Sequence, residues 1–193
     1  MLIDLKEIHT KSNYLSLVRL FLAVPFFLLL DHIHEAYSYR LIIFGLMIFG
    51  MITDLADGWL ARKLNEITEI GKIIDPLADK VAIGVIVIKL YLIGEIPDFY
   101  FWVIILRDLI IFTGGILVSR KIGKVLPSNL LGKITVITIG LFLFAVILDG
   151  ANYAPGIYDF FYYLSIFMSF VSVIGYGIRG YESIKWKRRN EAV

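Results

Sequence analysis

Residues 54–79 read DLADGWLARKLNEITEIGKIIDPLAD, and this stretch joins two long apolar segments. Eight of its residues form the pattern D-x-x-D-G-x-x-A-R, eight spacers, then G-x-x-x-D-x-x-x-D. They are Asp54, Asp57, Gly58, Ala61, Arg62, Gly71, Asp75 and Asp79. A carboxylate at bilayer depth costs about 2.5–3.5 kcal/mol, so four of them in so short a stretch need a compensating cation. The stretch therefore predicts two membrane helices that share a functional site.

Apolar segments continue on both sides of this stretch. The chain has 193 residues, of which 59% are hydrophobic and only 19% charged, and this composition excludes an ordinary soluble domain. Six apolar segments each approach the ~20 residues that a helix needs to cross the hydrocarbon core. They cover about residues 14–30, 39–60, 73–92, 99–118, 130–148 and 160–178. The sequence thus predicts an all-α integral membrane bundle of six transmembrane helices.

The segments outside this bundle are short, which predicts a single membrane domain. Residues 1–12 alternate apolar and charged side chains, as an amphipathic juxtamembrane helix would, although a frayed tail fits equally well. Residues 13–180 would form the bundle, and residues 181–193 a basic tail. Turns are expected at residues 94–98 and 149–159, which contain glycine and proline. The chain has no cysteine, which excludes disulfides and thiolate metal sites.

Basic residues gather at every second loop of the predicted bundle and at both ends of the chain, and these lie on one side of the membrane. Lys and Arg mark the first end, the second loop, the fourth loop and the tail, whereas only Arg40 and Lys89 flank the other loops. The positive-inside rule then predicts that both termini and the active site face the cytoplasm. We expect the protein to lie in the cell inner membrane. The net charge of +2 is small, but its weighting toward the cytoplasmic face favours anionic lipid and phosphate partners, and no nucleic-acid partner is expected.

The first part of the aspartate stretch has helical spacing. Asp54, Asp57, Gly58, Ala61 and Arg62 lie at i, i+3, i+4, i+7 and i+8, so a helix places all five positions on one face. Two carboxylates beside two minimal side chains and a guanidinium suit a bulky phosphate ligand that approaches the backbone closely.

The second part can complete the site from the next helix. Asp75 and Asp79 are i, i+4 neighbours, and the short loop before them predicts an antiparallel pair of spans. The four carboxylates would then meet near the cytoplasmic interface. Oxygen ligands without His or Cys favour Mg²⁺ or Mn²⁺, and two such ions would neutralise the four charges.

The four carboxylates could instead have purely structural roles. Asp75 before Pro76 could be a helix N-cap, and Asp54 and Asp57 could form structural ion pairs. Structural roles of this kind do not account for the glycines, the alanine and the arginine at the same time. A divalent-cation transporter is a second functional hypothesis, but a conduction path needs polar groups in both halves of the membrane.

The eight-residue pattern resembles the signature of the CDP-alcohol phosphatidyltransferases at every fixed position. Asn13, Leu15, Ser16 and Arg19 are also similar to the N-x-L-T-x-x-R that opens the family's first span, with serine in place of threonine. The resemblance implies a six-helix membrane enzyme, usually a homodimer. It would transfer a phosphatidyl group from CDP-diacylglycerol to an alcohol and release CMP, a reaction that a non-catalytic lipid-binding scaffold would not perform.

The resemblance also implies a role for individual residues. Asp54, Asp57 and Asp75 would bind one metal ion, Asp54, Asp75 and Asp79 the other, and Asp79 would be the base. The positions implied to contact the substrate, from the two motifs together, are Asn13, Ser16, Arg19, Asp57, Gly58, Ala61, Arg62 and Thr68.

The acceptor alcohol is indicated by weaker features. The stretches D-P-L-A-D-K at residues 75–80 and L-R-D at residues 106–108 look most like the phosphatidylglycerophosphate synthase branch, which uses glycerol 3-phosphate. Arg107 and Lys133 are spare cations that a phosphorylated acceptor would neutralise. Alternatively, a carboxylate of another span balances Arg107, while Asp108 points elsewhere. Residues 127–135 lack the second lysine of that branch's G-K-x-K-T, so inositol phosphate, serine, phosphatidylglycerol or another polyol remain open as acceptors.

Overall fold

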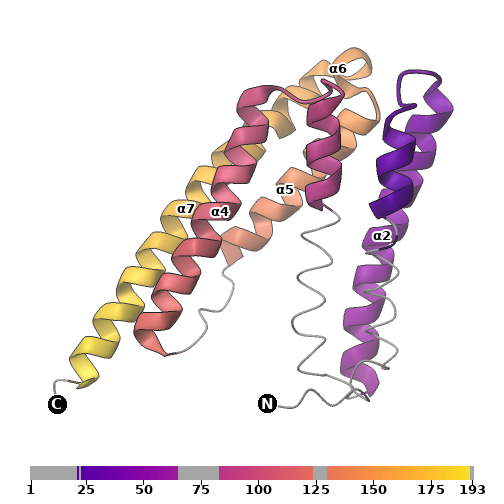
Figure 1. Ribbon diagram of the computed structural model, residues 1–193. Helices are drawn as coiled ribbons and strands as arrows, with labels where there is room; N and C mark the ends of the chain where they lie inside the picture. Colours follow the sequence, from indigo (N-terminus) through magenta and orange to yellow (C-terminus); the bar gives the residue numbers. More distant parts are fainter. Residues whose placement is uncertain (1–20, 22, 65–82, 124–129, 192–193) are drawn as a thin grey trace. The chain divides into compact units, whose positions relative to one another are not determined.

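The computed structural model describes residues 21, 23–64, 83–123 and 130–191, and these residues form helices and turns without a β-strand. The chain divides into two compact units, Met1–Glu95 and Ile96–Val193. Figure 1 shows the helices of both units, which are described separately below. The described part of the chain confirms the all-α prediction.

The first unit contains a helical segment at residues 23–30, helix α2 (Tyr37–Leu64) and the apolar helix Ile83–Leu92. Helix α2 has 28 residues and contains the whole predicted span 39–60. It has no proline, so no backbone donor is missing from its interior. Backbone hydrogen bonds from His32 to Leu29 and from Glu35 to His32 form the turn before it.

Two ion pairs, each with a buried cation, connect segments of the first unit. Arg40 Nη2 donates to Glu95 Oε1 at 2.7 Å, and Lys89 Nζ lies 2.6 Å from Asp31 Oδ1. Lys89 also stands 4.1 Å from the ring centroid of Phe27. Arg40 and Lys89 are the two cations that depart from the charge asymmetry of the sequence. The structure gives a reason for them, since each is buried against a carboxylate from another segment.

The second unit contains α4 (Asp98–Ile122), α5 (Leu130–Ile147), the single turn α6 (Gly150–Tyr153) and α7 (Pro155–Glu191). Helix α7 packs against both α4 and α5, and α6 lies between α5 and α7 in the chain. Helix α4 ends at Gly123, whose left-handed backbone (φ 72°) lets its N–H donate to Ser119 O at 2.8 Å.

The interior of the second unit combines aromatic rings with small hydroxyl residues. Tyr100 and Phe142 are fully buried, with ring centroids 4.4 Å apart. Toward the other end, Thr135 Oγ1 donates to Leu131 O and to Met168 O, at 2.7 and 3.0 Å. Because serine and threonine satisfy their hydroxyls on helix carbonyls, they allow close helix packing without an unpaired polar group.

Three described helices are long and apolar enough to cross a membrane, namely Asp98–Ile122, Leu130–Ile147 and Pro155–Lys187. They correspond to the last three predicted spans, and with the composition they identify an integral membrane protein. Helix α7 begins at Pro155, so the turn predicted at residues 149–159 is too long, and the helix continues to Glu191, so most of the predicted basic tail is helical. Residues 1–12 and parts of the first and third predicted spans lie outside the described residues.

Candidate functional site

The first half of the aspartate stretch lies on one continuous helix. Helix α2 extends to Leu64 and therefore contains positions 54, 57, 58, 61 and 62. Their spacing places the five positions on one helical face, so the local geometry assumed from the sequence is confirmed at the level of the backbone. Leucine, alanine and arginine residues near Gly58 have high helix propensities, which offset the low propensity of glycine.

The second half of the stretch lies outside the described residues. This holds for Thr68, Gly71, Asp75 and Asp79, and also for Asn13, Ser16 and Arg19 of the N-terminal motif. The meeting of four carboxylates thus stays a prediction. Among the described residues, no group of three or more His, Asp or Glu side chains could hold a metal ion.

Arg107 is buried in α4 and has two polar partners. Its Nε donates to Ser172 Oγ of α7 at 3.1 Å, and its Nη1 donates to Asp108 Oδ1 at 2.5 Å. The alternative in which Asp108 points elsewhere is therefore wrong, and no carboxylate of another span pairs with Arg107 in the described part of the chain. Cβ atoms at i and i+1 diverge on a helix, but the long arginine side chain lets its guanidinium reach the neighbouring carboxylate.

Lys133 lies on the first turn of α5 and is exposed, whereas Gly132 beside it is buried. Its position at a helix start, within the second unit, leaves its ammonium accessible to an anion. The structure does not bring Lys133 into contact with Arg107 through any described interaction. Their common role in binding an acceptor phosphate stays a prediction.

Ser172 is the residue that the sequence interpretation missed. It lies 65 residues from Arg107 along the chain and is fully buried, as Ser165 and Ser169 nearly or fully are. A signal for it was available, because serines at 165, 169 and 172 follow the i, i+4, i+7 spacing of one helix face. Hydroxyls at that spacing inside an apolar helix predict a polar seam against which a buried arginine can pack.

Comparisons with known proteins agree with the signature. The profile of the CDP-alcohol phosphatidyltransferase family matches residues 9–174. A protein of Mycoplasma pneumoniae, named CDP-diacylglycerol–glycerol-3-phosphate 3-phosphatidyltransferase, is 33% identical over 91% of this chain and 89% of its own length. A protein of Aquifex aeolicus with the same name is 31% identical over 89% of this chain and 96% of its own length.

Part of the chain is more closely similar to a third relative. The Bacillus subtilis protein of the same name is 43% identical over 46% of each chain. The family profile covers most of the chain, and the first two relatives are matched over nearly their whole length. This chain therefore belongs to the CDP-alcohol phosphatidyltransferase family.

Proposed function

We propose that this protein transfers a phosphatidyl group from CDP-diacylglycerol to glycerol 3-phosphate, forming phosphatidylglycerophosphate and CMP. The observation that carries the proposal is the match, over about nine-tenths of the chain, to two relatives whose names state this reaction. Family membership favours a transferase over the divalent-cation transporter considered from the sequence.

The donor atoms of the aspartate stretch fit a divalent cation. Asp54 and Asp57 stand three positions apart on α2, followed by Gly58 and Ala61 on the same helical face. Carboxylate oxygens are the ligands that Mg²⁺ and Mn²⁺ prefer, and Asp75 and Asp79 would complete the set for two ions. When bound, such ions would withdraw charge from the diphosphate and stabilise CMP as a leaving group.

The protein residues would position the two substrates and move one proton. Arg62, Gly58 and Thr68 would hold the CDP moiety. The acceptor hydroxyl oxygen would form a bond to the phosphorus that carries diacylglycerol, while the bond from that phosphorus to the CMP oxygen breaks. Asp79 would accept the hydroxyl proton, a general-base contribution that typically accelerates such reactions by about 10²–10⁴.

Arg107 and Lys133 would bind the phosphate of the acceptor. Arg107 is buried but its partner Asp108 has a half-exposed side chain. Because water can solvate Asp108 when the pair separates, exchange of that carboxylate for a substrate phosphate is less costly than it would be in a fully buried pair. A guanidinium–phosphate contact can be bidentate, which adds geometric specificity as well as energy.

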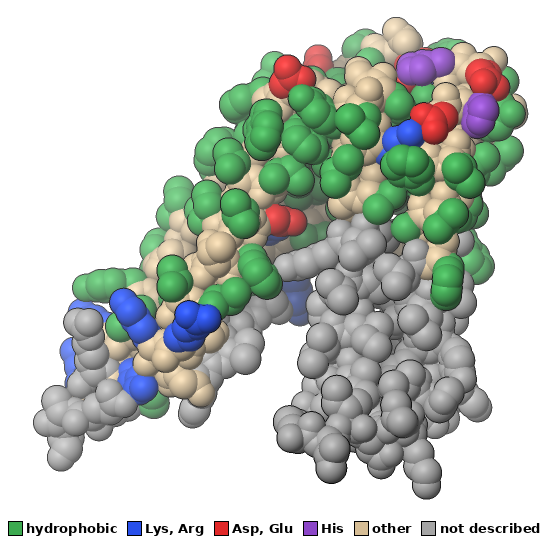
Figure 2. Space-filling view, viewed as in Figure 1, with side chains coloured by type: hydrophobic (Ala, Val, Ile, Leu, Met, Phe, Trp, Pro, Cys, Tyr) green, Lys and Arg blue, Asp and Glu red, His purple; other side chains and the backbone are tan. Residues whose placement is uncertain are grey.

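We further propose six membrane spans, an interfacial helix at residues 1–12 and a homodimer in the inner membrane. Both termini would be cytoplasmic. Charge distribution in the second unit supports this orientation, since Asp98, Asp149 and Asp159 lie at one end of its helices. The opposite end carries Lys and Arg side chains (Figure 2).

The test is an assay of the purified protein with CDP-diacylglycerol, Mg²⁺ or Mn²⁺, and a panel of acceptors. Glycerol 3-phosphate, inositol phosphate, serine and phosphatidylglycerol are each offered while CMP and the lipid product are measured. We expect CMP release with glycerol 3-phosphate and its loss in Asp79→Asn, with CDP-diacylglycerol binding retained. CMP release with a different acceptor alone would overturn the acceptor, and no release with any acceptor would overturn the reaction.

A further inference from the structure

The ends of α4 and α7 carry exposed basic side chains at one level of the second unit. Arg120 and Lys121 lie in the last turn of α4, and Lys185 and Arg189 lie in the last turns of α7. All four are exposed. We refer to these four residues as the terminal basic surface. Figure 2 shows Lys and Arg side chains gathered at this end of the two helices.

A hydrogen bond and a close approach of the two backbones bring the helix ends together, so the terminal basic surface is a feature of the packed structure. Lys187 Nζ donates to the Lys121 carbonyl at 3.0 Å, which places a cation at the negative end of the α4 dipole. One turn or more further into the unit, a Cβ atom on Gly180 would stand 3.0 Å from Val118 Cγ2. The close approach at Gly180 therefore brings the last turns of α7 beside those of α4.

The length of α7 places this surface beyond the hydrocarbon core. The helix has 37 residues, which corresponds to about 55 Å at 1.5 Å per residue, whereas the core is about 30 Å thick. Ile157 to Ile178, both exposed, already cover that thickness. The turns that follow Ile178 would then cross the headgroup layer, which is where Lys185 and Arg189 lie.

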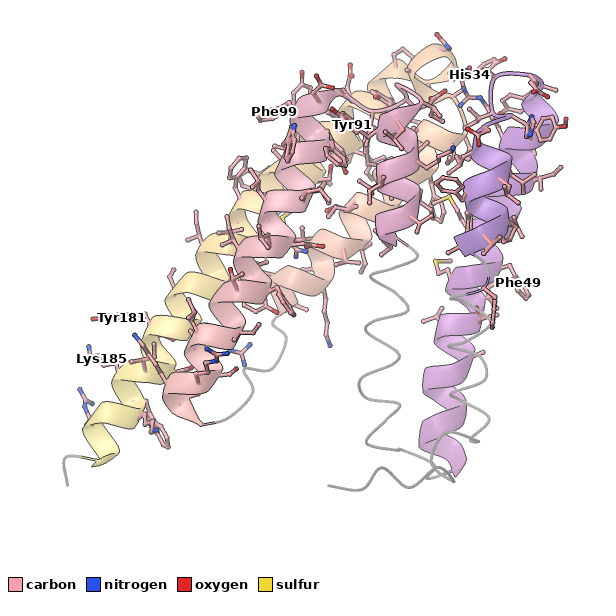
Figure 3. All side chains as sticks on the ribbon, viewed as in Figure 1. His34, Phe49, Tyr91, Phe99, Tyr181 and Lys185 are labelled. Atoms are coloured by element: carbon pink, nitrogen blue, oxygen red, sulfur yellow. The ribbon has the colours of Figure 1, made fainter. Side chains whose placement is uncertain are left out.

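Aromatic side chains mark the same level. Tyr181 and Trp186 are 68% and 66% exposed, although both are large apolar groups with one polar atom. Such side chains concentrate at the headgroup level of membranes. Tyr181 and Lys185 project from the same side of α7, away from α4 (Figure 3). The only carboxylate among residues 178–189, Glu182, is exposed and is outnumbered by the cations around it.

We propose that the terminal basic surface binds the headgroups of anionic phospholipids. Four exposed cations from two helices, at headgroup level and beside two aromatic anchors, are complementary to a lipid phosphate that carries no compensating ammonium. A phosphatidylcholine or phosphatidylethanolamine headgroup would bring its own cation into this surface and be disfavoured. Basic residues near an anionic membrane each favour binding by about fivefold, so several of them select anionic over zwitterionic lipid.

The experiment measures which lipid lies next to Trp186. The whole protein is placed in phosphatidylcholine nanodiscs that contain a small fixed fraction of either brominated phosphatidylglycerol or brominated phosphatidylcholine. Bromine quenches nearby indoles, and the Trp186 signal is the difference between the protein and its Trp186→Phe variant. Trp102, exposed near the other end of α4 beside Asp98, is measured in the same way through Trp102→Phe.

We expect brominated phosphatidylglycerol to quench Trp186 at least about threefold more than brominated phosphatidylcholine, and Trp102 equally with both. The triple variant Arg120→Gln, Lys185→Gln and Arg189→Gln should bring the Trp186 ratio to about one. The matched control Arg120→Lys, Lys185→Arg and Arg189→Lys keeps the charge and should keep the preference. These residues are exposed, so the variants should fold, which chromatography and helix content check directly.

A Trp186 ratio below about twofold in the unaltered protein would overturn the proposal, as would an unchanged ratio in the glutamine variant. A preference for brominated phosphatidylglycerol at Trp102 as large as that at Trp186 would also overturn the proposal, because the anionic lipid would then gather around the whole protein. Loss of the preference on addition of inorganic phosphate would assign the surface to a soluble anion instead. The readout needs no turnover, so its failure is distinct from failure of the proposed transferase reaction.

Discussion

Arg40 in the first unit and Arg107 in the second are both buried guanidiniums in an apolar protein, but their carboxylate partners differ. Arg40 pairs with Glu95, 55 residues away, whose side chain is only 13% exposed. Arg107 pairs with its neighbour Asp108, whose side chain is 49% exposed. A pair buried at both ends is shielded from water and ligands and acts as a structural connection. A pair with one accessible end can exchange that partner for a ligand.

The largest effect on stability is expected when the Arg40–Glu95 pair of the first unit is broken. Glu95→Gln removes the carboxylate that neutralises Arg40, and a buried cation that loses its counter-ion typically costs about 3–5 kcal/mol. The apparent unfolding temperature in detergent should fall strongly. The double change Arg40→Met and Glu95→Leu should recover much of the loss because apolar replacements remove both charges. A double variant as unstable as Glu95→Gln would contradict the structural role of this pair.

A smaller effect, on the KM for glycerol 3-phosphate, is expected when Arg107 of the Arg107–Asp108 pair is replaced. Arg107→Gln should raise KM for glycerol 3-phosphate by about 10- to 100-fold, the equivalent of about 1.5–3 kcal/mol for charged hydrogen bonds, with a much smaller change in kcat. Steady-state kinetics with varied acceptor provide the measurement. Ser172→Ala removes one hydrogen bond of Arg107 and keeps its charge, so KM should change by less than about threefold. An unaltered KM in Arg107→Gln would remove Arg107 from the acceptor site.

The two ends of the Lys89–Asp31 pair should respond unequally. Lys89 is buried, while the side chain of Asp31 is 51% exposed. Water can therefore solvate Asp31 when the lysine is removed, but it cannot easily solvate Lys89 when the aspartate is removed. Asp31→Asn should cost about 1–3 kcal/mol, because it leaves an ammonium buried against the Phe27 ring. Lys89→Met should cost less than Asp31→Asn. Thermal unfolding of the two variants side by side decides the order. The reverse order would mean that burial of the remaining side chain does not determine the cost of breaking the pair.

The smallest effect on stability is expected at Asp108. Unlike Lys89, the Arg107 guanidinium keeps a described hydrogen bond, to Ser172, when its carboxylate partner is removed, so Asp108→Asn should change the free energy of unfolding by less than about 1 kcal/mol. Unfolding in detergent measures this next to Glu95→Gln. A loss similar to that of Glu95→Gln would show that both guanidinium pairs are structural, and the contrast between the Arg40 pair and the Arg107 pair would disappear.

Much of the fold was accessible from sequence because hydrophobic length is a local property. The last three predicted spans coincide with α4, α5 and α7 in their central parts, and the span 39–60 lies within α2. Their ends were less predictable. Pro155 was interpreted as part of a turn, yet proline at the first position of a helix loses no hydrogen bond, so α7 begins there.

The candidate site, like the fold, was predictable from the sequence only in part. The spacing of Asp54, Asp57 and Arg62 is helical, and α2 is a helix at those positions. The partner of Arg107 could not be read from spacing, since i and i+1 positions diverge while the guanidinium is long enough to return to its neighbour. Asp75 and Asp79 lie outside the described residues, and their convergence with Asp54 and Asp57 stays a prediction.

The amino-acid sequence alone determined the all-α membrane class, the aspartate signature and the family, because apolar length and short-range spacing are properties of contiguous residues. Only the tertiary structure decided which buried charges are neutralised and by what. Arg40 meets Glu95, Lys89 meets Asp31, and Arg107 meets both Ser172 and Asp108. Such pairings depend on how helices pack and how side chains bend, and a buried charge accepts only the partner that packing brings within reach.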